Sequence, residues 1–122
     1  ELAAQTEELF LSEFGVRAIG AQHLHQATLA LPQRLRHFTG VTSLNGVMGQ
    51  GSNSAISAGN LVIEALMVRR AERGLPASIM RFSRVADVGS NAKNPLRYAS
   101  AVSAISELPA RLCATFFRAT LV

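Results

Sequence analysis

Apolar residues between Thr6 and Leu31 recur mostly at three- and four-residue steps, and no proline interrupts them. This spacing is typical of one face of an α-helix. Thr6 suits the N-cap, the glutamates that follow suit the positive end of the helix dipole, and Pro32 ends the pattern. The pattern therefore predicts a helix over residues 6–31, with an apolar face made of Phe10, Phe14, Ala21, Leu24, Ala27 and Leu31.

Two short runs of apolar and β-branched residues predict strands at 37–43 and 77–82. Between them, Asn53 or Ser54 can cap a second helix, which ends at Gly74 after arginines in its last turn. Strands that alternate with helices of this length pair in parallel through right-handed crossovers. The order helix, strand, helix, strand therefore indicates an α/β fold.

The C-terminal third lacks a strong period. Residues 90–104 have the composition of a loop, and a last helix is expected from Ser106 to Leu121, with Pro109 near its start. The chain has 122 residues, of which 48% are hydrophobic and 16% charged. This length holds one core and excludes a two-domain protein, and this composition excludes a disordered chain. We expect a single segment over residues 1–122.

Cysteine and charge content indicate a cytoplasmic protein. Cys113 is the single cysteine, which excludes an internal disulfide and a cysteine-based zinc site. The N-terminus is acidic up to Arg17, the reverse of a signal peptide. The long charge-free run over residues 38–63 is rich in glycine, serine and asparagine, so we expect no membrane helix.

The net charge is +4, and eleven of the twelve basic residues are arginine. The arginines cluster at positions 34 and 36 and at positions 69, 70 and 73, without interleaved aromatic residues. Nucleic-acid platforms combine basic grooves with aromatic side chains. The pattern therefore favours solvated helix ends over a nucleic-acid interface, although a small basic nucleic-acid-binding protein stays as an alternative.

Three motifs that could carry chemistry have the wrong spacing. The glycines of residues 46–51 fit neither a dinucleotide fingerprint nor a P-loop, so we expect a structural turn there. Ser43 does not stand in a G-x-S-x-G elbow. His23 and His25 are two residues apart and face different ways on a helix, so we expect no metal site.

Several stretches together follow one known pattern. They are Thr6-Glu7-Glu8-Leu9, residues 20–25, residues 42–49, Asn60, Glu64-Ala65-Leu66, residues 73–77 and Val88-Gly89. In these stretches the chain resembles the ketoreductase domain of polyketide synthases, within the short-chain dehydrogenase/reductases. The resemblance implies a partial Rossmann-like fold, with residues 90–104 as a lid-like loop, and the NADPH-dependent reduction of a β-ketoacyl thioester to its β-hydroxyacyl form. It also implies an acyl carrier protein as partner.

The resemblance also assigns site residues. Ser43 takes the place of the substrate-orienting serine, thirteen residues before the place of the tyrosine acid, which is Ile56 here. Asn60 matches the family's asparagine, and Arg17 takes the place of its lysine. The glycine-proline turn beside the nicotinamide corresponds to Ser83 and Arg84.

Two of these replacements change the chemistry. A hydrocarbon side chain has no proton to donate to the alkoxide that hydride transfer generates. Arginine keeps the charge of lysine but is no proton relay. The glycine-rich loop that holds the coenzyme pyrophosphate is also not among these 122 residues.

Three functions stay open at this point. The first is a silent ketoreductase-like segment, a C-terminal half that serves as a scaffold or is a degenerate copy. The second is an active reductase that the missing N-terminal half, or the remainder of a synthase, completes. The third is the nucleic-acid-binding protein. The first and third predict that this chain alone binds no NADPH.

Overall fold

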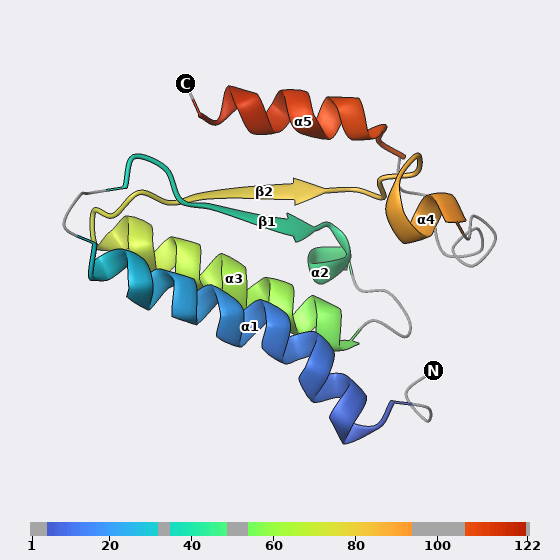
Figure 1. The fold of residues 1–122 in the computed structure, drawn as a ribbon, viewed down its shortest axis with the longest axis horizontal. Coiled ribbons are helices and arrows are strands. Elements are labelled where there is room, and N and C mark those ends of the chain that lie inside the picture. Colours follow the sequence, from blue (N-terminus) through green and yellow to red (C-terminus); the bar gives the residue numbers. More distant parts are fainter. Residues whose placement is uncertain (1–4, 32–34, 49–53, 94–106, 122) are drawn as a thin grey trace.

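The computed structural model describes residues 5–31, 35–48, 54–93 and 107–121. The elements, in chain order, are α1 (Glu7–Leu29), β1 (Thr39–Ser43), α2 (Asn45–Met48), α3 (Ser54–Glu72), β2 (Ser78–Phe82), α4 (Gly89–Lys93) and α5 (Ala110–Ala119). Figure 1 shows α1 and α3 side by side below the two strands, and α5 above them. The alternation of helices and strands confirms the predicted α/β class.

The two strands pair in parallel, as predicted. The register runs from Thr39 opposite Ser78 to Ser43 opposite Phe82. The side chains of Thr39 and Ser78 are hydrogen-bonded across the pair, with 2.8 Å between their hydroxyl oxygens. Because both strands run the same way, their carboxyl ends lie at the same edge of the sheet. This edge faces α2 and the first turns of α3 (Figure 1).

Helix α1 begins where the sequence predicts, but the buried face differs. The hydroxyl of Thr6 accepts a hydrogen bond from the backbone N–H of Leu9 at 3.2 Å, which confirms the N-cap. Ala18 and His25 are the buried residues of α1, whereas Leu24 of the predicted apolar face is 63% exposed. The prediction of the buried face was wrong because α1 packs on α3 through Arg17, Ala18 and His25 rather than through its most apolar positions.

Helix α3 packs tightly against both α1 and the sheet. A Cβ atom at Gly59 would lie 2.8 Å from the Cβ of Arg17, so α1 and α3 approach closely at that point. A Cβ atom at Gly40 would lie 2.8 Å from Ile63 Cγ2 and 3.0 Å from Met67 Cγ, so glycine also sets the distance between β1 and α3. The helix ends as predicted, with Gly74 at a φ of 66° and the N–H of Leu75 donating to the carbonyl of Arg70.

Two short helices were not predicted. Helix α2 occupies part of the expected turn, and the carbonyl of Leu44 accepts hydrogen bonds from the backbone N–H groups of Val47 and Met48, both at 3.0 Å. Helix α4 occupies the described part of the expected loop over residues 90–104. The remainder of that loop lies outside the described residues. Segments this short carry no periodic signal.

Helix α5 begins at Ala110 rather than at Ser106. Leu108 is extended instead and forms a parallel bridge with Val85, which adds a rung beside the end of β2. A residue before proline is disfavoured in the helical region, and Leu108 precedes Pro109. The carboxylate of Asp87 accepts a hydrogen bond from the N–H of Ala110 at 2.7 Å, so it caps the first turn of α5.

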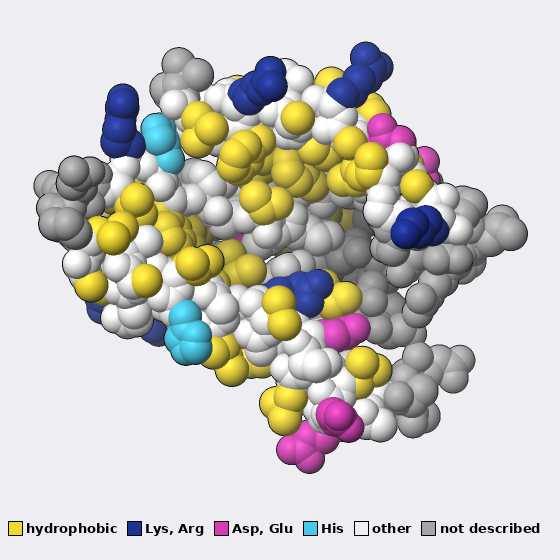
Figure 2. Space-filling view, in the orientation of Figure 1, with side chains coloured by type: hydrophobic (Ala, Val, Ile, Leu, Met, Phe, Trp, Pro, Cys, Tyr) yellow, Lys and Arg dark blue, Asp and Glu magenta, His cyan; other side chains and the backbone are white. Residues whose placement is uncertain are grey.

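The core of the described residues is small. Ala18, Ala55, Met67 and Met80 are its buried hydrophobic members. The apolar residues of α5 are partly exposed, and hydrophobic side chains gather over this part of the surface in Figure 2. In the described part of the chain, none of the helices is both long and apolar enough to cross a membrane.

Candidate functional site

The carboxyl edge of the sheet brings together residues from both strands. Ser43 is the last residue of β1 and is half-buried. The N–H of Leu44 donates to the carbonyl of Phe82 at 3.0 Å, so the hydrogen bonding between the two segments continues one residue beyond the end of β1. Ser83 and Arg84 follow β2 directly and therefore leave the sheet at the same edge as Ser43.

The N-terminal half of α3 supplies the residues beneath this edge. Ile56 lies in its first turn and is half-buried, and Asn60 lies one turn later with 5% of its surface exposed. Helix α2 lies against this turn, because a Cβ atom at Gly46 would be in van der Waals contact with the Cβ of Asn60, at 3.5 Å. Position 56 therefore offers a hydrocarbon surface and no proton donor.

Arg17 reaches the same region from α1. Its stem lies over Gly59, between Ile56 and Asn60 in the sequence of α3. Its guanidinium donates to the backbone carbonyl of Glu13 at 2.7 Å. This hydrogen bond holds the charged group on its own helix, one turn towards the N-terminus.

Ser83 and Arg84, the two residues that follow β2, have different surroundings. The Ser83 hydroxyl is buried and has no hydrogen-bond partner among the described residues. The guanidinium of Arg84 forms an ion pair with Glu107 at 2.9 Å and is largely buried.

A buried carboxylate anchors both strands to α3. Glu64 accepts hydrogen bonds from the Thr42 hydroxyl at 2.7 Å and from Arg81, whose Nε and Nη2 reach its two oxygens at 2.8 and 2.7 Å. The hydrogen bond from Arg81 is the main reason that the pKa of Glu64 is lowered, while burial opposes this shift. The same hydrogen bond raises the pKa of Arg81. The network fixes the sheet on the helix that carries position 56.

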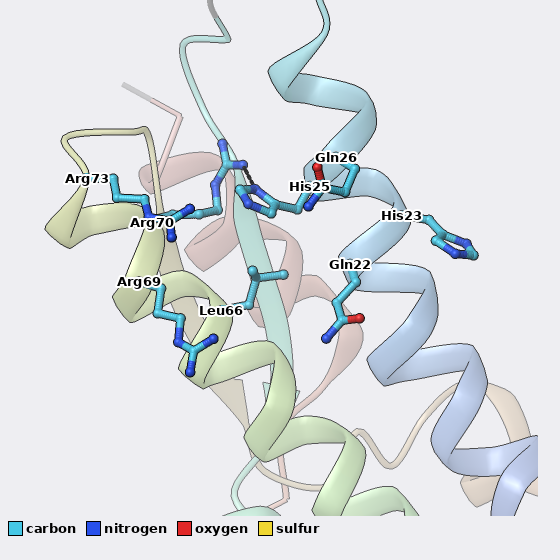
Figure 3. A pocket seen from close by; sticks show the side chains of 8 residues that line it. All are labelled: Gln22, His23, His25, Gln26, Leu66, Arg69, Arg70 and Arg73. Carbon is cyan, nitrogen blue, oxygen red and sulfur yellow. Dashed lines mark hydrogen bonds between the residues drawn. The ribbon is translucent and has the colours of Figure 1, made fainter.

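A second buried charge lies at the other end of α3. Arg70 is 2% exposed, and its Nη1 lies 2.6 Å from Nδ1 of His25 and 3.2 Å from the Thr28 hydroxyl. Its Nε donates to the carbonyl of Pro76 at 3.1 Å, and the guanidinium lies 3.9 Å from the centre of the Phe38 ring. Figure 3 shows the pair where α1 and α3 meet. Burial lowers the pKa of Arg70.

Sequence reasoning missed both buried networks. The signals in the sequence were a charged residue inside a strand, Arg81, and a histidine at a helix position that faces a neighbour, His25. Neither signal names the partner, which lies on another element. In the described ranges, no group of three or more histidine, cysteine, aspartate or glutamate residues could hold a metal ion.

Comparison with known proteins gives one consistent family. Residues 1–87 match the KR domain. A highly reducing polyketide synthase of Gibberella moniliformis is 37% identical over 78 residues, which cover 64% of this chain and 3% of that protein. The fusarin C synthetase of Gibberella fujikuroi is 36% identical over 80 residues, covering 66% of this chain and 2% of the relative.

A highly reducing polyketide synthase of Alternaria alternata is 31% identical over 81 residues, covering 66% of this chain and 3% of that protein. These relatives are large multidomain synthases, and this chain spans 2–3% of their length. No solved structure matches it. The KR match extends over most of the chain, including both strands and the helices between and before them, and this chain therefore belongs to the KR domain family of polyketide synthases.

Proposed function

We propose that this chain is a silent ketoreductase segment of a polyketide synthase, the C-terminal half of a domain that no longer reduces its substrate. KR domains use NAD(P)H, and the parent reaction is the reduction of a β-ketoacyl thioester to a β-hydroxyacyl thioester. The observation that carries the proposal is Ile56. It occupies the first turn of α3 at the carboxyl edge, one turn before Asn60, in the place of the family's tyrosine.

The loss of the hydroxyl has a definite chemical consequence. Hydride transfer to a ketone leaves an alkoxide, which needs a proton from a donor within hydrogen-bond reach. Ile56 has no such donor. Arg17, which the resemblance puts in the place of the family's lysine, does not give up its proton, and its guanidinium is hydrogen-bonded to the backbone carbonyl of Glu13. General acid catalysis contributes roughly 10²- to 10⁴-fold to a rate, so a KR domain built with this segment reduces slowly or not at all.

The remaining role is that of a scaffold within the synthase. A largely apolar groove of about 510 Å³ lies between β1, α1 and α3, and none of its lining residues belongs to β2. Its lining includes Val16, Gly20 and Leu24 of α1, Gly40 and Val41 of β1, and Ile63 and Met67 of α3. Parallel sheets are normally covered and extended on both sides. We propose that the remainder of the KR domain completes the sheet here, with the acyl carrier protein as a further partner of the synthase.

The test is a chimera. Residues 1–87 replace the matching segment in the KR domain of the Gibberella moniliformis synthase, and the reduction of a β-ketoacyl thioester is followed through NADPH consumption. The Ile56 chimera should be inactive. Ile56→Tyr should raise the rate by about 10²-fold or more, because the ring then supplies a hydroxyl at the edge. Ile56→Phe restores the ring without the hydroxyl and should stay inactive. Reduction by the unmodified chimera at the rate of the parent synthase would refute the proposal.

Among the described residues, β2 is the one strand that pairs with β1, and this favours a second candidate, an active reductase that other sequence completes. Titration of the 122-residue chain with NADPH, followed by nucleotide fluorescence, addresses the chain itself. The silent segment predicts no saturable change. Saturable binding by the chain alone would favour the reductase, and the chimera would then decide whether the bound coenzyme is used.

A further inference from the structure

A cavity of about 380 Å³ lies between the last two turns of α1 and α3, far along α3 from Ile56 and Asn60. Helix α1 contributes Gln22, His23, His25 and Gln26. Helix α3 contributes Leu66, Arg69 and Arg70, and Arg73 follows directly after it. Figure 3 shows Gln22 and Arg69 extending towards each other from the two helices, while His23 points away. None of these lining residues is acidic.

The wall of this cavity holds a buried positive charge without a carboxylate partner among the described residues. The polar contacts of Arg70 are with His25, Thr28 and the carbonyl of Pro76, all neutral groups. Arginine only donates hydrogen bonds, so Nδ1 of His25 must accept. We therefore assign the neutral ring with its proton on Nε2, which makes this nitrogen a donor as well. Burial and the charges of Arg70 and Arg73 favour this neutral form by lowering the pKa of His25.

The mouth of the cavity adds two more guanidinium groups. Arg69, in the last turn of α3, and Arg73, the residue directly after this helix, are both exposed and four residues apart, and both line the cavity. The amides of Gln22 and Gln26 stand one turn apart on α1 in the same way. The cavity thus combines three cations with neutral donors. Guanidinium forks match the oxygens of tetrahedral oxyanions, and such charge-assisted hydrogen bonds are strong.

We propose that the cavity between the C-terminal turns of α1 and α3 binds an oxyanion of the phosphate class. The bound anion supplies the negative charge that the lining residues lack. The cavity is large enough for one or two phosphate groups. Arg69 and Arg73 would hold them at the mouth, with the amides of Gln22 and Gln26 opposite. The site lies on the side of the fold away from position 56, and its occupancy is independent of reduction.

Titration of the 122-residue chain with inorganic pyrophosphate, followed by calorimetry, tests the site. The unmodified chain should bind in a saturable, one-to-one manner. The double variant Arg69→Gln/Arg73→Gln should bind at least tenfold more weakly, and because both side chains are exposed, its circular dichroism spectrum should be unchanged. Arg118→Gln removes an exposed arginine from the last turn of α5 and is the matched control, which should bind as the unmodified chain does.

The ring signals of the histidines provide a local readout of the same titration. Nuclear magnetic resonance should show that His25 responds to pyrophosphate with the calorimetric affinity, while the exposed His37 does not. Absence of saturable binding at millimolar pyrophosphate would overturn the proposal. An equal loss of affinity in Arg118→Gln would also overturn it, because diffuse positive charge would then explain binding. Citrate binding as tight as pyrophosphate binding would refute the phosphate class.

Discussion

Helix α3 carries two buried charged groups that are stabilised in opposite ways. In its middle, Glu64 is neutralised by the fork of Arg81 and a hydroxyl hydrogen bond from Thr42. At its end, Arg70 is surrounded by neutral acceptors and an aromatic ring. The burial of a charge costs free energy unless a partner compensates it. The first group is compensated within the chain, whereas the second keeps an uncompensated positive charge.

The two networks join α3 to different parts of the fold. The neutral network joins α3 to both strands and fixes the edge that carries Ser43 and Ile56. The positive network joins α3 to α1 and to the loop before β2. Its carbonyl and imidazole acceptors satisfy the hydrogen-bonding capacity of Arg70 but not its charge. The first network is therefore structural, and the second is also suited to attract an anion.

Arg70→Met should give the largest loss of stability. The substitution removes the donor from His25, Thr28 and the Pro76 carbonyl at once, and it removes the contact with Phe38. The His25 acceptor is buried and the other two acceptors are half-buried. An unsatisfied buried acceptor costs about 1–3 kcal/mol and the lost packing adds to this, so we expect the free energy of unfolding to fall by roughly 3–5 kcal/mol. Urea denaturation measures it. Arg69→Met, at the exposed neighbouring position, should change stability by less than about 0.5 kcal/mol.

Glu64→Gln should cost less, about 1–3 kcal/mol, because the amide keeps the shape and one acceptor while Arg81 can turn towards water. Glu72→Gln, at an exposed position near the end of the same helix, is the control and should be close to neutral. Urea denaturation again measures the change. If Glu64→Gln destabilised the chain more than Arg70→Met does, the contrast between the two networks would be reversed.

Gly59→Ala tests the helix contact that brings His25 to Arg70. Alanine improves helix propensity by about 1 kcal/mol, but its Cβ would lie 2.8 Å from that of Arg17, and overpacking costs about 1–3 kcal/mol. We expect a net loss of roughly 1 kcal/mol in thermal or urea unfolding. Gly20→Ala has open space around its Cβ and should instead stabilise the chain by about 0.5–1 kcal/mol. Equal effects at both glycines would show that the helices do not meet as closely as described.

The two networks affect the free energy of unfolding in different pH ranges. The pKa of His25 is below its ordinary 6.5 in the folded chain, so the unfolded chain binds more protons there, and stability falls as the pH drops below about 6.5. The pKa of Glu64 is below its ordinary 4.5, so its contribution is lost only at pH values below about 4.5.

Each group gives a slope of at most about 1.4 kcal/mol per pH unit in the free energy of unfolding. Urea denaturation between pH 3 and 8 should show the upper step disappear in His25→Gln and the lower step shrink in Glu64→Gln. An upper step that survives in His25→Gln would assign that step to another group.

The sequence predicted the two long helices and both strands because each carries a clear period or a run bounded by proline or glycine. The parallel pairing followed from their order. The start of α5 was placed too early because the extended segment at Leu108 depends on a bridge to Val85. Short helices such as α2 depend on single backbone hydrogen bonds, for which composition gives no signal.

The candidate site was predictable through the spacing of Ser43 and position 56, which the family resemblance provides. The two buried networks were not predictable in this way. His25 and Arg70 are 45 residues apart, and Glu64 and Arg81 are 17 residues apart, so each pair forms through packing. Helix periodicity assigns a residue to a face, but the partner on the facing element depends on the crossing of the helices.

Gly40 is a position at which substitutions disturb the packing of β1 on α3. Every missense change at that codon adds a Cβ atom 2.8 Å from Ile63 Cγ2 and 3.0 Å from Met67 Cγ, so the strand, the helix or these side chains would have to shift. A gene copy released from all constraint would accumulate such changes as freely as those at Ile56. Individuals of one population that vary at position 56 but keep glycine at position 40 would therefore carry a polypeptide that selection still requires to fold.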